Sequence, residues 1–272
     1  TLSRGLGDVY KRQKYTNLET MTNTFINCRN IVSNGWSFIP ADLQSAKSLE
    51  GTFRNAFAFQ GSDQDNFPTL TTTSTLKSVG SCFYSTGLNA FVGDKPFTVS
   101  SSIENWDFAF YNNNLTSILI ETSGATSMNS TFYNNDFVSF PAIVTDKVTN
   151  LTSCWQSSKE LTSFPALNTS KVTMISYAWY ECKKLTTFPT LDLTGCTEFT
   201  YTWGSCETMT SFPQLDFSNA TYLFRVWYQC YGLGKDQEFP LIDTSNVTFM
   251  EGTWFYNSCL LYTSDAADEL CR

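Results

Sequence analysis

The sequence has no histidine among its 272 residues. This absence removes the usual general base, the usual activator of a nucleophile and the commonest metal ligand of proteins. The sequence also lacks a glycine-rich phosphate loop and a Gly-x-Ser-x-Gly nucleophile motif. We therefore expect a protein that is not an enzyme and that carries neither a metal ion nor a cofactor.

Basic residues and long apolar runs are also scarce. The 17 Lys and Arg are outnumbered by 25 Asp and Glu, which leaves a net charge of −8 at pH 7. An acidic chain disfavours nucleic acid and anionic membranes as partners. No stretch is apolar enough to span a bilayer, so we expect no direct membrane insertion of this chain. The many Thr, Ser, Asn and aromatic residues favour an extracellular protein, at a cell surface or a virion surface.

What the sequence does contain is a repeat with a period of about 24 residues. Phe-Pro pairs recur along its second half, at Phe140-Pro141, Phe164-Pro165, Phe188-Pro189, Phe212-Pro213 and Phe239-Pro240. A tryptophan follows each of these Phe residues by 15 positions, at Trp155, Trp179, Trp203, Trp227 and Trp254. A fixed period in this range is typical of proteins built from stacked repeats.

The columns of this repeat predict its secondary structure. Between 8 and 21 residues after each Phe, apolar residues are spaced by three and four, which predicts a short helix or helical turn. The Leu-Thr-Ser-Phe run before each Pro predicts a short strand. Ten aromatics in one column mark the coils: Phe25, Phe53, Phe83, Phe110, Phe132 and the five tryptophans. We predict an α/β solenoid of about ten coils of about 24 residues, with short parallel strands plus short helices or helical turns.

The motifs resemble the BspA-like leucine-rich-repeat surface proteins. The residues that carry the resemblance are Leu161-Thr162-Ser163, the Asp-Thr-Ser-Asn-Val-Thr stretch at 243–248, and Trp179 followed by Cys182. The resemblance is strong over 140–257 and weaker over 20–139. It implies a leucine-rich-repeat solenoid and, by analogy, a surface-exposed binding role.

The two ends of the chain look foreign to the repeats. Residues 3–13 and 259–269 read as translations of one sequencing adapter in its two orientations. We therefore expect 1–13 and 259–272 to be adapter-derived and the chain between them to be a metagenomic fragment. Within it, irregular repeats over 14–139 and regular repeats over 140–258 are expected to form one continuous solenoid.

The candidate ligand-binding residues are of two kinds, tyrosines and hydroxyl residues. Four tyrosines fall off the apolar stripe, and an aromatic ring with a polar edge suits sugars and peptides: Tyr177, Tyr180, Tyr201 and Tyr228. Hydroxyl residues before the Phe-Pro pairs form a second candidate face: Thr162, Thr186, Thr187 and Thr210. Ordinary surface packing of the tyrosines and cross-strand contacts of the hydroxyls are the alternatives. The tryptophans share a stripe with Val, Leu and Cys, so we predict a buried structural ladder.

Two further columns have alternative interpretations. Carboxylates and an amide repeat at Asn168, Asp192, Asp216 and Asp243. They suggest either calcium between coils or side chains that bind their own backbone in turns, and we favour turns. Cys182, Cys206 and Cys230 share another column. Parallel side chains in one inward column are poorly placed for bridging, so we favour buried free thiols over disulfides.

These observations together predict a non-enzymatic repeat protein for surface adhesion or for protein or glycan binding. Its partner would be a protein or glycan on another surface, with weak subsites summed along the repeated face. The alternative is a passive structural shaft or spacer of a larger surface protein or viral fibre. The two differ in whether the tyrosine and threonine columns contact a ligand.

Overall fold

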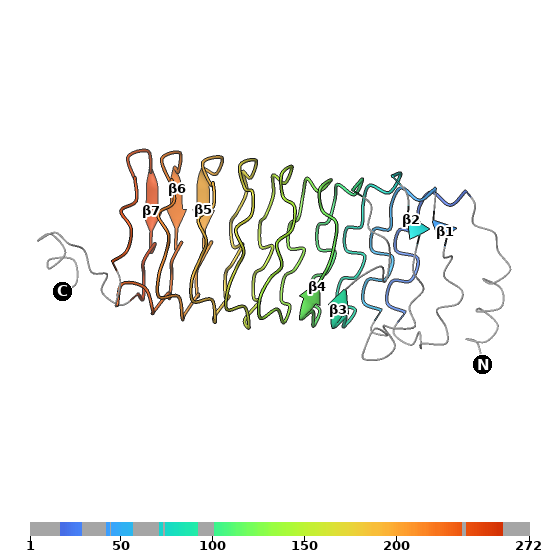
Figure 1. Ribbon diagram of the computed structural model, residues 1–272, viewed down its shortest axis with the longest axis horizontal. Helices are drawn as coiled ribbons and strands as arrows, with labels where there is room; N and C mark the ends of the chain where they lie inside the picture. Colours follow the sequence, from blue (N-terminus) through green and yellow to red (C-terminus); the bar gives the residue numbers. More distant parts are fainter. Residues whose placement is uncertain are drawn as a thin grey trace, which may run out of the picture.

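The computed structural model describes residues 17–28, 42–43, 45–56, 71–72, 74–91, 101–235 and 238–257. The ends predicted to be adapter-derived, 1–13 and 259–272, lie outside the described residues. Figure 1 shows the chain as a row of upright coils, from blue at one end to red at the other. Coils of the irregular first half and of the regular second half follow one another in the same row.

Short parallel strands join some of the coils. The seven strands of the described residues are β1 (Asp42–Leu43), β2 (Thr71–Thr72), β3 (Ala90–Phe91), β4 (Ser117–Ile118), β5 (Glu198–Thr200), β6 (Tyr222–Phe224) and β7 (Phe249–Glu251). They form three separate parallel sheets, in the orders β1-β2, β3-β4 and β5-β6-β7. In the last sheet Phe199 lies beside Leu223, which lies beside Met250.

Isolated parallel bridges continue this register through the earlier coils. They join residues in the series Thr20, Ser48, Ser78, Asn105, Ser127, Asn150 and Met174. The steps of this series are 28, 30, 27, 22, 23 and 24 residues, so the coils vary in length in the first half and become regular later. Each coil therefore contacts the coil before it and the coil after it at the same point of the repeat.

Tandem turns follow each bridge, centred on the ten aromatics named above, which we call the core aromatics. Around Trp155, N–H groups of alternate residues donate to carbonyls of the next coil: Ser153 to Ser176, Trp155 to Ala178 and Ser157 to Tyr180. The N–H groups between them donate to carbonyls three residues back: Cys154 to Leu151, Gln156 to Ser153 and Ser158 to Trp155. Half of these backbone N–H groups thus form hydrogen bonds within their own coil, and the other half bond to the next coil.

A left-handed residue stands two positions before and two positions after every core aromatic. The ten pairs include Asn23 and Asn27, Ser153 and Ser157, and Tyr177 and Glu181, with φ between 49° and 63°. A positive φ at the third residue is the requirement of a type II turn. Since L-residues do not continue an α-helix through this conformation, the left-handed residues exclude the helix that the spacing predicted.

The predicted leucine-rich-repeat α/β solenoid is therefore wrong. No helix occurs in the described residues, and the strands are two or three residues long in three separate small sheets. The predicted strand before each Pro is also not formed: in that run the described residues have one isolated bridge, Ser139 to Ser163. Strands β5, β6 and β7 lie instead in the segment for which a helix was predicted.

The core is a set of inward columns that run through the stack. In one coil Leu151, Cys154, Trp155, Ser158 and Leu161 are 0% exposed. The Phe of each Phe-Pro pair lies edge-on to the tryptophans, as Phe164 does to Trp155 at 4.7 Å and to Trp179 at 5.2 Å between ring centroids. Burial of these large rings supplies most of the apolar contact between coils.

Candidate functional site

The four tyrosines predicted as ligand contacts lie together on one side of the stack, and we call them the tyrosine cluster. Tyr201 is at its centre: its ring centroid is 5.3 Å from that of Tyr177, 5.2 Å from Tyr180 and 5.7 Å from Tyr228. Tyr177 stacks on Tyr201 at an interplanar angle of 17°, and the other two rings meet it edge-on. All four are half-buried.

The tandem turns place these side chains. Tyr177 and Tyr201 occupy the left-handed position before a core tryptophan, with φ of 60° and 49°. Tyr180 and Tyr228 come directly after a core tryptophan, where Gly204 stands in the coil between them. A Cβ on Gly204 would be 3.0 Å from the Tyr201 ring and 3.1 Å from the Tyr180 ring. The glycine therefore leaves the space into which Tyr201 leans.

Arg225 continues the column of Tyr177 and Tyr201 into the next coil, again with a positive φ, of 52°. Its guanidinium carbon lies 5.0 Å from the ring centroid of Phe224, 5.5 Å from that of Tyr228 and 5.7 Å from that of Tyr201. Nη1 donates a hydrogen bond of 2.6 Å to the Tyr201 hydroxyl, which raises the pKa of Arg225 above its ordinary value. Arg225 was not predicted as a site residue, because the predicted ligand contacts were chosen among tyrosines and hydroxyl residues.

Exposed aromatics extend the cluster over the last described coil. Phe255 and Tyr256 are 52% and 58% exposed. Their rings pack against Tyr228, at 6.1 Å and 5.8 Å between centroids. The aromatic surface therefore passes from half-buried rings in the coils of Tyr177 and Tyr201 to largely exposed rings in the coil of Phe255.

A second aromatic column, also missed from the sequence, lies on the earlier coils. Tyr111 stacks between Tyr84 and Tyr133, with centroids 4.5 Å and 4.3 Å away and nearly parallel rings. Arg54 lies over the Tyr84 ring, 4.5 Å from its centroid. These residues follow their core aromatics by one position, as Tyr180 and Tyr228 do, so the spacing contained the signal. Burial, then the neighbouring tyrosines, raises the pKa of Tyr111 to about 12.

Burial also raises the pKa of Tyr177 and of Tyr180 above the ordinary tyrosine value. The hydroxyls of Tyr177 and Tyr180 are therefore neutral at physiological pH, when they can donate as well as accept hydrogen bonds. Polar side chains accompany the rings in the second left-handed column. There Ser157 Oγ is 2.9 Å from Glu181 Oε2, and Ser205 Oγ is 3.2 Å from Gln229 Oε1.

The threonine hydroxyls of the second predicted face form hydrogen bonds within the stack. The hydroxyls of Thr162, Thr186 and Thr210 donate to backbone carbonyls of the preceding coil, at 3.0, 3.2 and 3.4 Å. Their hydrogens therefore stabilise the stack and leave only acceptor lone pairs for a ligand. Thr187 is exposed beside Thr186. In the described part of the chain, the structure records no contact between these threonines and the tyrosine cluster.

The tryptophan column lies inside the molecule. Adjacent rings stack from Trp155 to Trp254 with centroids 5.4 to 5.8 Å apart. Trp155, Trp179, Trp203 and Trp227 are 0% exposed, and Trp254 in the last described coil is half-buried. Four of these five rings therefore have no surface with which to meet a ligand.

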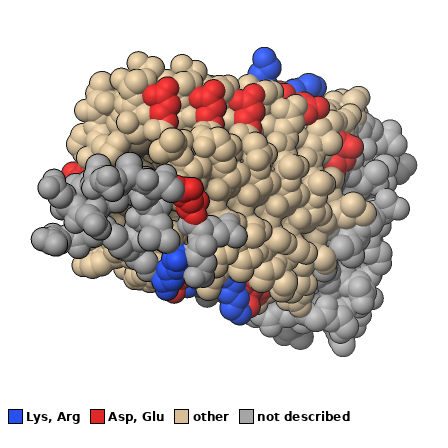
Figure 2. Space-filling model, turned by 60° about the vertical axis from the view of Figure 1, so that its left-hand side comes forward, with Lys and Arg blue, Asp and Glu red and all other residues tan. Residues whose placement is uncertain are grey.

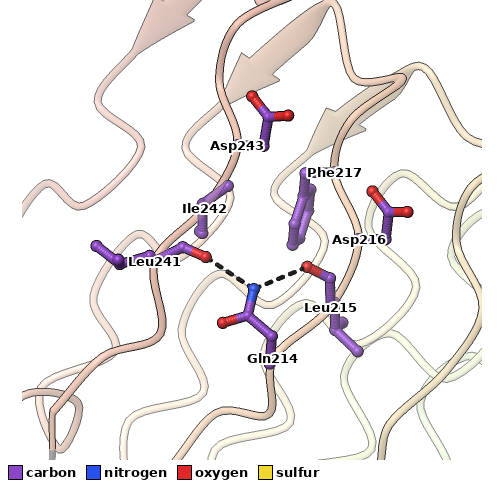
Figure 3. A pocket seen from close by; sticks show the side chains of 7 residues that line it. All are labelled: Gln214, Leu215, Asp216, Phe217, Leu241, Ile242 and Asp243. Atoms are coloured by element: carbon purple, nitrogen blue, oxygen red, sulfur yellow. Dashed lines mark hydrogen bonds between the residues drawn. The ribbon is translucent and has the colours of Figure 1, made fainter.

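A shallow groove of about 560 Å³ lies between the last two described coils (Figure 3). Its apolar lining includes Leu215, Phe217, Leu241 and Ile242, and Asp216 and Asp243 stand at one end. The side-chain amide nitrogen of Gln214, Nε2, donates to the Leu241 carbonyl at 2.8 Å and so bridges the two coils. This amide nitrogen and one oxygen of each carboxylate bond to the backbone, and the remaining lining of the groove is mainly apolar.

The aspartate column makes turns. Asp192, Asp216 and Asp243 each accept the N–H of the residue two positions on, at 3.1, 2.8 and 2.9 Å. Hydrogen bonds from Thr194, Ser218 and Ser245 lower the pKa of the three carboxyls. Figure 2 shows acidic side chains in a row along one edge of the molecule. No group of His, Cys, Asp or Glu side chains in the described ranges is arranged to hold a metal ion.

Comparisons with protein families, with curated proteins and with solved structures find no match for this chain. The resemblance to the BspA-like proteins thus stays a prediction from the sequence, and its leucine-rich-repeat fold is the part that the structure contradicts. Over the residues that the structure describes, no helix has the length and apolar character needed to cross a membrane.

Proposed function

We propose that this chain is a non-enzymatic binding module, which attaches to a glycan or protein on another surface through the tyrosine cluster. The observation that supports it is the meeting of four half-buried tyrosines from three successive coils in one continuous surface. Each ring offers an apolar face or edge together with a hydroxyl, the combination that suits sugars and peptides. Contacts from several coils add up along the ligand.

The backbone of the cluster supports the same proposal. Bulky residues are rare at positive φ, and each costs about 1–3 kcal/mol unless its surroundings fix it. Tyr177 and Tyr201 stand there, although Asn, Gly or Ser fills the same column in several other coils. The packing of the core alone does not require large rings at these positions. Such strained positions recur at binding sites, where they hold a side chain ready for its ligand.

The absence of catalysis is part of the proposal. The chain has no histidine. In the described residues the shifted pKa values belong to buried thiols, to aspartates in turns, to stacked tyrosines, and to two cations and one glutamate in hydrogen bonds. One of the cations, Lys183, forms an ion pair with Glu207, but both side chains are exposed at the surface. We place the module outside the cell or on a virion, because its acidic, hydroxyl-rich and aromatic-rich composition suits that setting. Nucleic acid and membranes are not among the proposed partners.

The test is an array of glycans and host-surface proteins probed with the full chain. We expect concentration-dependent binding that is weakened by about tenfold or more when Tyr177, Tyr180, Tyr201 and Tyr228 are together replaced by Ala, since aromatic anchors dominate such interfaces. The matched control replaces the same four residues by Phe, which keeps the ring contacts. Circular dichroism and urea unfolding establish that both variants remain folded.

Binding that survives the four Tyr→Ala substitutions in a folded variant would move the site away from the cluster. A folded wild-type chain that binds nothing on the array would favour the alternative function, a passive shaft or spacer. That alternative needs only the continuous core and the coil-to-coil hydrogen bonds, and it predicts that the four tyrosines can be replaced without loss of any binding.

A further inference from the structure

Arg225 is the one cation beside the tyrosine cluster, and it forms no ion pair with any residue that the structure describes. The four ion pairs of the described residues are all formed by lysines, at Lys47, Lys77, Lys183 and Lys184. Within these ranges the only arginines are Arg54 and Arg225, and both lie over tyrosine rings. Arginine is thus used here where a planar cation must stack, and lysine where a point charge is enough.

The hydrogen-bonding groups of Arg225 are only partly used. Of its five N–H groups, one on Nη1 donates to Tyr201, while Nε is enclosed and has no partner among the described residues. One hydrogen on Nη1 and two on Nη2 remain. Phe224, Tyr201 and Tyr228 lie around the guanidinium, and these three hydrogens are the donors left for a ligand. One hydrogen on each Nη can bind one of the two oxygens of a carboxylate.

We propose that the tyrosine cluster binds an acidic glycan, whose sugar rings pack on the tyrosines and whose carboxylate is held by Arg225. The proposal rests on the proposed function and narrows its ligand to one chemical class. A neutral sugar would leave the charge of Arg225 without a counter-charge after water has been displaced from it, which costs free energy. A uronate supplies both a ring for the aromatic face and an anion for the cation.

Glutamates lie near Arg225, and they favour an acidic ligand of low charge density over one of high charge density. Glu251 is near enough to influence Arg225 but forms no ion pair with it. Glu198 stands on the coil before that of Arg225, and Glu181 on the coil before Glu198. A polymer with one carboxylate per sugar can place one group at Arg225 while its neighbours remain in solvent. A densely sulfated chain would bring many anions close to these glutamates, so we expect it to bind less tightly.

The test compares polygalacturonate with its fully methyl-esterified form, which has the same sugar backbone without the charge. We expect the full chain to bind the acidic polymer about tenfold or more tightly than the ester by calorimetry. Arg225→Gln should remove this preference and leave similar affinity for both polymers. Arg225→Lys should restore it only in part, because lysine lacks the planar fork. Lys171→Gln, which removes one exposed charge elsewhere, should change neither affinity.

The outcomes separate this inference from the proposed function. If the wild-type chain binds the ester as well as the acid, or Arg225→Gln keeps the preference, the inference is wrong although the cluster still binds glycan. If the chain binds polyglutamate but neither polymer, the carboxylate comes from a protein and the inference is wrong. If nothing binds here or on the array, both proposals fall together.

Discussion

Single side chains close the turns of this protein, and the aspartate column shows how. The side-chain oxygen of Asp192 accepts the N–H of Thr194, and Asn168 does the same for Ser170 one coil earlier, at 3.2 Å. An aspartate and an asparagine thus serve the same role in one column. The turn needs an acceptor oxygen, and the charge of the aspartate adds to the strength of the bond.

This equivalence predicts a change in acid stability. Hydrogen bonds lower the folded-state pKa of Asp192, Asp216 and Asp243 below an ordinary value near 3.8. A lowered pKa contributes stability that is complete above the ordinary value and is lost as the pH falls through it toward the folded-state pKa. Replacing all three by Asn should therefore lower the urea midpoint slightly at pH 7, where the contribution of the charge is lost, and reduce its further fall on acidification.

The matched comparison replaces the three aspartates by Ala. Alanine has no acceptor, so this variant should lose stability at pH 7 as well as at low pH. If the Asn variant is as acid-sensitive as the wild type, other carboxyls account for acid unfolding and the turn carboxylates do not contribute to it.

At the scale of the elements, the spacing of apolar residues indicated the wrong secondary structure but the right inward positions. Leu151, Cys154, Trp155 and Ser158 are fully buried and are spaced by three, one and three residues. A helix buries residues at these intervals. Tandem turns with left-handed residues four positions apart bury the same four residues. The spacing of apolar residues therefore does not distinguish a helix from tandem turns. The deciding feature was the pair of left-handed residues around each core aromatic, and both members are Asn, Ser or Gly in five of the ten pairs.

The candidate site was predictable to a similar extent. Tyr177, Tyr180, Tyr201 and Tyr228 were found from the sequence because they leave the apolar stripe. Arg225 and the Tyr84, Tyr111 and Tyr133 stack were not. Each of these residues stands one or two positions from a core aromatic. The turn conformation shows that side chains at these positions lie side by side on successive coils.

The left-handed positions predict opposite effects for two serine-to-glycine substitutions. Ser153 has a φ of 52°, whereas its partner across the coils, Ser176, is not among the residues with positive φ. Glycine relieves about 1–2 kcal/mol of left-handed strain, against about 0.5–1 kcal/mol of added chain entropy. Ser153→Gly should therefore leave the free energy of unfolding unchanged or raise it. Ser176→Gly should lower it by about 0.5–1 kcal/mol.

Urea unfolding of the two variants measures this difference directly. Both substitutions remove the same side chain from half-buried positions of adjacent coils, so their loss of packing is similar. Equal destabilisation by both would show that the turn at Ser153 is not strained, and it would remove the strain argument from the column that also holds Tyr177 and Tyr201.

At the scale of the whole molecule, the stack depends on contacts between neighbouring coils. Every isolated bridge among the described residues joins one coil to the next, and such architectures can lose cooperativity when their interfaces differ in stability. The regular coils have closely similar interfaces from Trp179 to Trp227, with the same tryptophan, Phe and cysteine columns. We therefore expect these coils to open together rather than one at a time.

The cysteine column reports on this opening. Cys182, Cys206 and Cys230 are free and 0% exposed, and each thiol donates to the carbonyl of a core tryptophan in the preceding coil. Burial raises the pKa of all three thiols, that of Cys230 to about 12. Because the thiolate is the reactive form, these groups should resist alkylation at pH 8 until the coils separate.

The measurement is iodoacetamide labelling at increasing urea concentration, followed by mass spectrometry of the peptides. Half-buried Cys28 in the first described coil should react in the native protein, while the three column cysteines become reactive together at the midpoint of global unfolding. Labelling in guanidinium supplies the fully reactive reference. If Cys230 reacts at much lower urea than Cys182, the coil of Trp227 opens before the coil of Trp179. If all three react in native buffer as fast as Cys28, the buried thiol column is not the state of the protein in solution.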